Sequence, residues 1–149
     1  MPTVTVSFTP LPEHVRTARF IAASVARRAG VADDVLDEIK LAVSEACSLA
    51  VRFNLAHAPS SPVELRLIED PESFSVEVAD SVGRGAPDAD GELTFDLTTD
   101  DDRVDGVDLS GHERLGLAVI SGLVDEVKVE YLATGSVVTM TWPIGSGHG

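Results

Sequence analysis

Hydrophobic and polar residues alternate at the start of the chain and then take on a helical spacing. Val4, Val6 and Phe8 alternate with polar residues, a period of two that is typical of a strand, and prolines close it. From residue 13 to residue 29, apolar residues recur every three or four positions, and Gly30 provides a C-terminal stop. This part of the chain therefore predicts an edge strand followed by an amphipathic helix.

The longest periodic stretch predicts a second helix. It begins after Asp33 and Asp34, because acidic residues favour the start of a helix. Apolar residues then keep the helical period for about five turns: Leu36, Ile39, Ala42, Val43, Ala46, Leu49, Ala50 and Phe53. A loop rich in proline and serine follows over residues 56–62.

Alternation returns in the second half of the chain and predicts four more strands, over residues 63–67, 74–78, 127–131 and 138–142. Gly135 lies in the turn between the last two, and apolar residues from Leu115 to Leu123 predict a short helix before them. The order of elements lacks the alternation of strand and helix that parallel sheets require. The predicted fold class is α+β, a two-layer sandwich of a mainly antiparallel sheet with helices on one face.

The connection between residues 80 and 111 shows no periodicity and is strongly acidic. A connection of this length inside a compact domain is either a functional lid or a disordered segment. Its charge is typical of a solvated run, and it would also attract a basic partner surface. We expect a single domain over residues 1–144 with an acidic lid at 81–112, and a flexible tail at 145–149. The acids that follow Asp80 are Asp88, Asp90, Glu92, Asp96, Asp100, Asp101, Asp102, Asp105 and Asp108.

Composition and charge narrow the function. The chain has 149 residues, 44% of them hydrophobic and 5% aromatic, which fits one globular domain with an aliphatic core. A formal net charge of −14 disfavours direct binding to nucleic acid or to anionic membranes. The single cysteine, Cys47, cannot form an internal disulfide and is expected to be a small helix residue without a redox role. Four scattered histidines predict no metal site, and the lack of a leader or a long apolar run predicts a cytoplasmic protein.

Several segments follow the order of motifs in one known protein family. Residues 39–46, Ile-Lys-Leu-Ala-Val-Ser-Glu-Ala, resemble the second helix of that family. Arg19 on the first helix, Asp80 at the end of a strand and Leu-Gly-Leu at 115–117 follow in matching order. The chain thus resembles bacterial anti-sigma regulatory factors of the serine-kinase type, which belong to the superfamily of gyrase, heat-shock-90 and histidine-kinase ATPases, with the Bergerat-type fold.

The resemblance implies a biological role. Members of this family bind ATP, hold a sigma factor inactive and phosphorylate a serine on an anti-anti-sigma (STAS-domain) partner, a mechanism of partner switching. They usually work as homodimers. Arg19 resembles the family's arginine on the surface that both partners share, and Arg16 lies one turn earlier, so both are candidate partner-binding residues.

The second helix carries only half of the family's catalytic pair. In the family, a glutamate acts as general base, and an asparagine four residues later binds Mg²⁺. Glu45 fills the first position, but Leu49 fills the second and offers no ligand atom. Asn54 lies five residues further on, off the same helix face. Glu45 is therefore either a catalytic base or a helical carboxylate that is solvated or paired with a partner.

The first glycine box is shifted. In the family, an aspartate binds the adenine amino group, and glycines follow at the second and fourth positions after it. Here Asp80 is present, Val82 and Arg84 replace the glycines, and Gly83 and Gly85 lie one place late. An inserted residue would restore the turn, whereas an aspartate at such a turn is also common for local reasons.

The last glycine box is changed as well. In the family, a glycine-rich turn before the third helix receives the phosphates. Arg114 replaces the first glycine of this turn, and Gly116 is retained. The predicted cofactor-binding residues are therefore Asp80, Gly83, Gly85 and Gly116, with no metal ligand, and the two alternatives for the cofactor are none or ATP with magnesium.

Three functions follow from these departures. The first is a regulator that binds a sigma factor, an anti-anti-sigma protein or both, with ATP binding and kinase activity weakened or lost. The second is an active ATP-dependent serine kinase, which Glu45, Asp80 and Gly116 favour. The third is a sensor that binds another anionic ligand through Arg84 and Arg114, because guanidinium groups form bidentate contacts with phosphate.

Overall fold

The computed structural model describes residues 3–82, 93–96 and 111–144, with side chains described outside 93–96 and 111–114. The described chain forms three helices and one six-stranded sheet. In chain order the elements are β1 (Thr3–Phe8), α1 (Glu13–Arg28), α2 (Asp33–His57), β2 (Val63–Glu69), β3 (Ser73–Asp80), β4 (Leu93–Asp96), α3 (Gly111–Ser121), β5 (Glu126–Leu132) and β6 (Gly135–Pro143).

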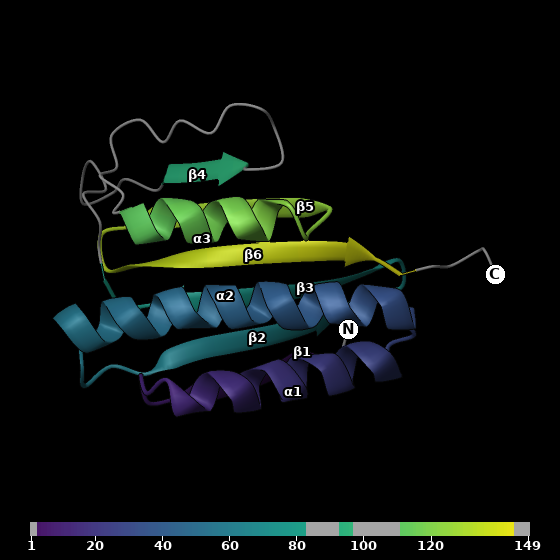
Figure 1. The fold of residues 1–149 in the computed structure, drawn as a ribbon, viewed down its shortest axis with the longest axis horizontal. Helices are drawn as coiled ribbons and strands as arrows, with labels where there is room; N and C mark the ends of the chain where they lie inside the picture. The colour runs from purple at the N-terminus through teal and green to yellow at the C-terminus, as the bar shows by residue number, and fades with distance from the viewer. Residues whose placement is uncertain (1–2, 83–92, 97–110, 145–149) are drawn as a thin grey trace.

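The sheet has the strand order β1-β2-β3-β6-β5-β4, and every neighbouring pair is antiparallel. Figure 1 shows α1, α2 and α3 side by side on one face of this sheet. The predicted two-layer α+β sandwich is therefore confirmed. None of the described helices, including the long α2, combines the length and the apolar character that crossing a membrane requires.

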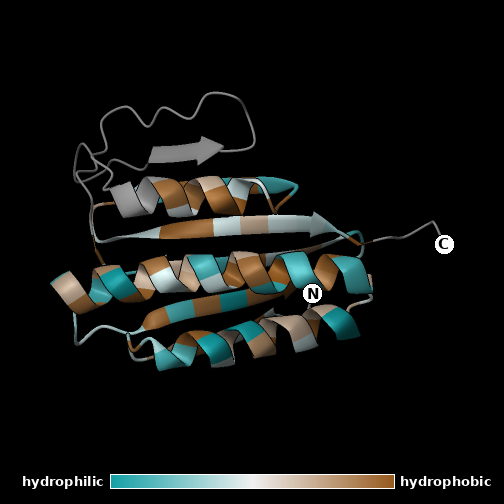
Figure 2. Ribbon diagram, in the orientation of Figure 1, coloured by the Kyte–Doolittle hydropathy of each residue, from teal (hydrophilic) through white to brown (hydrophobic). Residues whose placement is uncertain are grey.

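The core lies between the helices and one face of the sheet. Alternate strand residues such as Leu65, Val76 and Met140 are buried against helix residues such as Ile39 and Val43. Trp142 is fully buried, and its indole N–H donates to the carbonyl oxygen of Leu123 at 3.1 Å. Figure 2 shows hydrophobic and hydrophilic segments alternating along the helices, as expected for elements that bury one face.

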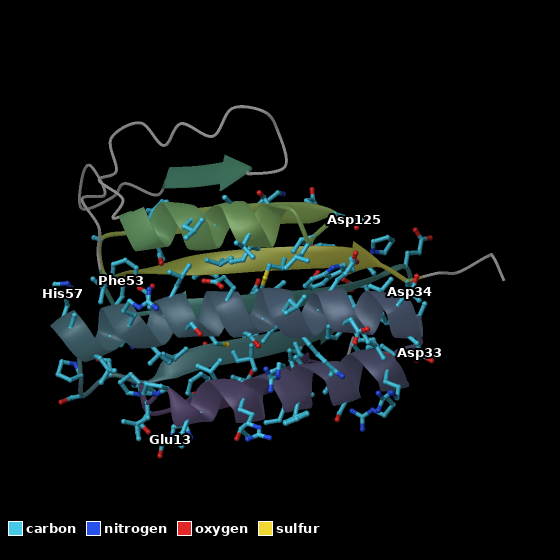
Figure 3. The ribbon with its side chains drawn as sticks, viewed as in Figure 1. Glu13, Asp33, Asp34, Phe53, His57 and Asp125 are labelled. Carbon is cyan, nitrogen blue, oxygen red and sulfur yellow. The ribbon has the colours of Figure 1, made fainter. Side chains whose placement is uncertain are left out.

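The helices pack in an antiparallel arrangement that brings the ends of several elements together. Figure 3 shows Glu13, at the start of α1, on the same side as His57, at the end of α2, whereas Asp33 and Asp34 lie at the opposite side. Gly30 has a φ of +98°, which confirms the predicted stop after α1. The short connection that follows it returns the chain along the neighbouring helix.

The structure differs from the sequence prediction at three element boundaries. The segment predicted to lack strands contains β4, whose four residues pair with β5 from Leu93↔Tyr131 to Asp96↔Lys128. Four residues are too few for alternation to stand out, so this part of the prediction was wrong. In addition, α3 begins at Gly111 rather than near Leu115, and α2 extends past Phe53 to His57.

Candidate functional site

One end of the candidate site lies where β3 ends beside the start of β6. Asp80 is directly opposite Ser136 in the antiparallel register. The Oδ1 atom of Asp80 accepts from the backbone N–H of Val82 at 3.0 Å and of Ser136 at 3.2 Å. The Ser136 hydroxyl donates to Oδ2 at 2.9 Å. The Asp80 carboxylate is thus fixed on three sides by neighbouring donors, because hydrogen bonds to an ionised acceptor are strong and directional.

Gly135 makes this arrangement sterically possible. A Cβ at this position would collide with the backbone carbonyl oxygen of Asp80 and would lie 3.2 Å from the Cα of Ser81. Any residue other than glycine would push the β5–β6 turn away from the end of β3. We call Asp80, Gly135 and Ser136 the Asp80 end of the site.

Asn54 ties α2 to the Asp80 end. Its side chain is fully buried, and its amide nitrogen donates to the carbonyl oxygens of Ser61 and Pro62 at 3.1 and 3.2 Å. Its Oδ1 atom accepts from the backbone N–H of Ser81 at 2.9 Å. These contacts assign Asn54 to the fold and argue against it as a replacement for the missing magnesium ligand.

The second end of the site lies between α2 and α3. A Cβ on Gly116 would lie 2.8 Å from Cδ1 and 3.1 Å from Cγ of Leu49, and 3.0 Å from Oε2 of Glu45. Leu49 is 5% exposed and Glu45 is half-buried. We call Glu45, Leu49 and Gly116 the Leu49 end. Leu49 and Asn54 are about 7.5 Å apart along the helix axis, so the two ends adjoin through α2.

The Leu49 end does not fit a magnesium ion. The Leu49 side chain fills the space against Gly116 with methyl groups, which supply no oxygen ligand. Among the residues that the structure describes, no cluster of three or more histidines, cysteines, aspartates or glutamates could hold a metal. Glu45 therefore faces an apolar contact between two helices rather than a set of hard oxygen ligands.

The candidate partner-binding arginines share one surface of α1. The guanidinium carbons of Arg16 and Arg19 lie 6.0 and 5.3 Å from the ring centre of Phe20, within range of a cation–π interaction. The Phe20 side chain is 51% exposed. Arg19 also lines a groove of about 370 Å³ with Phe20, Asp37, Lys40 and Leu41. An exposed aromatic ring between two cations is typical of a surface that contacts another protein.

Cys47 lies on α2 between Glu45 and Leu49 in the sequence, and it is not among the residues that define either end of the site. Its side chain is buried in the core, and burial raises the pKa of its thiol to about 12 because it disfavours the charged form. The thiol is therefore protonated at neutral pH. This agrees with the expectation of a structural helix residue, because reactive cysteines need a stabilised thiolate.

The structure brings part of the predicted site together. Glu45 and Gly116 meet across the α2–α3 contact, and Asp80 lies at the end of β3. Gly83, Gly85 and Arg84 lie outside the described residues, as does the side chain of Arg114.

Two residues that the sequence analysis missed are Gly135 as a close-contact glycine and Ser136 as the partner of Asp80. The available signal was the pairing itself. In an antiparallel pair, the end of one strand lies beside the start of its partner. Once β6 is placed beside β3, Ser136, the second residue of β6, is therefore expected close to Asp80, the last residue of β3.

This chain is similar in sequence to several known proteins. A family model described as the histidine kinase-like ATPase domain matches residues 8–142. A serine-protein kinase RsbW of Bacillus subtilis is 32% identical over 130 residues, which cover 87% of this chain and 78% of that protein. A serine-protein kinase RsbW of Listeria monocytogenes is 26% identical over 141 residues, covering 91% of this chain and 83% of that protein.

A solved structure supports the same fold. It contains the RsbU and RsbW domains of a protein from Mycobacterium tuberculosis, and it matches with a TM-score of 0.64 and 19% sequence identity. The match covers 95% of this chain and 32% of the chain in that structure, so this chain spans about a third of that chain's length. At this identity the match shows the shared fold alone.

Proposed function

This chain belongs to the histidine kinase-like ATPase domain family, and from that premise we propose that it is an anti-sigma regulator of transcription. It binds a sigma factor, an anti-anti-sigma protein with a STAS domain, or both. Its ATP binding and kinase activity are weakened or lost. The proposal draws on the family, on the arginines of α1 and on the altered Leu49 end.

The contact between Leu49 and Gly116 is the observation on which the proposed loss of nucleotide binding rests. A magnesium ion bridges phosphate oxygens in phosphoryl-transfer enzymes and neutralises their charge. With leucine at position 49, the protein supplies no ligand there, and the leucine methyl groups pack against Gly116 instead. A triphosphate that entered this end would have to separate α3 from α2 and would lack its metal bridge.

Titration with Mg-ATP tests this part of the proposal. Isothermal calorimetry of the purified chain should show weak or no binding, with the Bacillus subtilis RsbW titrated in parallel. Leu49→Asn alone should not restore binding fully if Arg114 also obstructs the phosphates, and Leu49→Asn combined with Arg114→Gly should restore more. A low-micromolar affinity that depends on magnesium would overturn the proposal.

An active serine kinase is the second candidate function, and the intact Asp80 end favours it. Asp80 is held in place by Ser136 whether or not the Leu49 end can accept phosphates. Transfer of labelled phosphate from ATP to the serine of a STAS-domain protein would select this function. Loss of that transfer in Glu45→Gln would then identify Glu45 as the general base.

Partner binding is proposed to use Arg16 and Arg19 on α1. The half-buried Arg19 and the exposed Arg16 flank Phe20, so they can offer charge and apolar area together. Arg19→Glu should weaken the capture of a sigma factor in a pull-down without changing the melting temperature. Arg28→Glu is the matched control, because Arg28 is an exposed arginine of the same helix, about half a turn round from Arg19. Equal capture by both variants would remove Arg19 from the site.

A homodimer is also proposed, and β1 supports it. This strand lies at one edge of the sheet and contains only threonine, valine, serine and phenylalanine. Edge strands that avoid pairing with other chains usually carry charges or prolines. Light scattering of the purified chain should therefore give about twice the mass of 15.7 kDa.

A further inference from the structure

A second groove crosses the helical layer on the other side of α2 from the α1 arginines. It has a volume of about 440 Å³ and lies between α2 and α3. The α2 residues that line it include Leu41, Ser44, Glu45 and Ser48, whose spacing of three and four places them on one helix face. Val119 and Leu123 are among the residues that line it from the side of α3. We call this the α2–α3 groove.

The polar groups inside this groove have unmet hydrogen-bonding capacity. The Oγ atom of Ser44 is buried and has no hydrogen-bond partner among the described residues. Within the same part of the chain, Glu45 forms no ion pair and no hydrogen bond. A buried polar atom without a partner is costly, and a half-buried carboxylate is stabilised by any donor that reaches it.

The charge of the groove selects a cation. Among the described residues that line it, none is a lysine, arginine or histidine, whereas Glu45 contributes a carboxylate. An anionic ligand would meet this carboxylate without compensation. A basic ligand would pair with it, and the net charge of −14 would draw that ligand toward the protein.

The rim of the groove is apolar. Leu41 is 59% exposed and Val119 is 42% exposed, and Leu115, one turn before Val119 on α3, is 66% exposed. These are three of the six large hydrophobic residues found exposed in the described part of the chain. Clustered apolar exposure of this kind marks a protein interaction site. The occupant must therefore combine a cation with flanking apolar groups.

We propose that the α2–α3 groove binds an arginine side chain that apolar residues flank on the surface of a protein partner. A guanidinium group carries five N–H donors in a planar fork, which can meet both oxygens of Glu45. The methylene stem and the flanking residues cover Leu41 and Val119. Arg16 and Arg19 do not line this groove, although Leu41 lines both it and the groove beside Arg19. The proposal holds whether or not those arginines contact a partner.

A designed peptide provides the test. It is a helix of about 16 residues, long enough for partial helicity, with one arginine flanked by leucines on an alanine and glutamine background. A second peptide carries citrulline, which keeps the shape of arginine but lacks its charge. Titration of each into the ¹⁵N-labelled chain, followed by NMR, maps the bound surface. The arginine peptide should shift the amides of residues 41–48 and 118–123.

The variants make the test specific. Glu45→Gln should weaken binding of the arginine peptide about tenfold, the effect of losing one hydrogen bond to a charged group. The citrulline peptide should bind the unaltered chain about tenfold more weakly for the same reason. Glu72→Gln is the matched control, because it removes the same charge from an exposed turn between β2 and β3, and should bind as the unaltered chain does. Val119→Ser should weaken binding less than Glu45→Gln does.

Each outcome decides the proposal. Equal affinity for both peptides would show an apolar groove without selection for charge and would overturn it. So would shifts confined to other surfaces, undiminished binding by Glu45→Gln, or no binding at all. Shifts of the groove amides with protein concentration alone would identify a second copy as the occupant instead. Loss of sigma-factor capture in Arg19→Glu tests the proposed function separately.

Discussion

The two ends of the candidate site are held together by different kinds of contact. At the Asp80 end, a backbone carbonyl and a carboxylate lie against the backbone of β6, and Gly135 leaves no room for a side chain. At the Leu49 end, Gly116 faces the tips of the flexible side chains of Leu49 and Glu45. Backbone contacts cannot shift without moving a strand, whereas side-chain tips can change rotamer. The Asp80 end should therefore tolerate no added atoms, and the Leu49 end should accept compensated changes.

The largest effect is expected from Gly135→Ala. The added methyl group would collide with the Asp80 carbonyl oxygen, so the turn must move and the free energy of unfolding should fall by about 3 kcal/mol or more. Urea unfolding measures the change. Gly122→Ala is the control, because a Cβ there first meets the Val119 carbonyl oxygen at 3.5 Å, an ordinary contact. Equal stability of the two variants would contradict the close contact between Gly135 and the backbone of Asp80.

The Leu49 end should show compensation. Leu49→Ala removes buried methyl groups and should cost about 2–3 kcal/mol. Gly116→Ala should destabilise the unaltered chain, because its Cβ would lie 2.8 Å from Leu49 Cδ1. In the Leu49→Ala background only the flexible tip of Glu45, 3.0 Å from the new Cβ, has to move. The higher helix propensity of alanine should then make Gly116→Ala stabilising by up to about 1 kcal/mol. A double-mutant cycle measures the coupling, and additive effects would contradict the proposed contact.

Alkaline unfolding tests whether water reaches the buried thiol of Cys47 on α2. The pKa of Cys47 is raised to about 12 in the folded chain, above its unfolded value, so the stability that the neutral thiol contributes is present below the unfolded pKa and is lost as pH rises. Between pH 7 and pH 10 the unaltered chain should lose about 1.4 kcal/mol more stability than Cys47→Ala. Urea unfolding at several pH values gives this difference. Parallel curves for the two proteins would mean that water reaches the thiol.

The smallest effect is expected from Ser136→Ala. It removes the hydroxyl that donates to Asp80 Oδ2 and keeps the backbone donor, so the cost should be about 1 kcal/mol. Ser121→Ala serves as control, because its hydroxyl donates to the Ala118 carbonyl oxygen at an exposed site. A loss in the control that matches the loss in Ser136→Ala would show that the bond to Asp80 has no special weight.

Most of the fold could be predicted, because most of its helices and strands show their hydrophobic period within a short stretch of sequence. The helical period of α2 and the alternation of β2 and β3 are properties of neighbouring residues, and the core face follows from them. β4 could not be predicted in the same way, because its four residues form a strand only by pairing with β5. The start of α3 at Gly111 was missed for a similar reason, since no apolar residue marks its first turn.

The residues of the candidate site also divide into those that a local pattern predicts and those that depend on distant contacts. Residue types at fixed spacing on one helix are visible in the sequence, so the presence of Glu45 and the replacement of the expected asparagine by Leu49 were both predicted. Ser136 and Gly135 were not, because they act on Asp80 from 56 and 55 residues away along the chain. The helical spacing places Asn54 off the face of Glu45, and only its contacts with Ser61, Pro62 and Ser81 show its structural use.

The sequence by itself determined the class of fold, the acidic charge and the leucine at position 49, where the family resemblance implies a metal ligand, because composition, period and residue type are local properties. Only the tertiary structure decided what replaces that ligand. The packing of Leu49 on Gly116, the clamp on Asp80 and the groove beside Glu45 all depend on which elements become neighbours. Neighbours distant in sequence are chosen by burial of the whole core, and no local pattern records that choice.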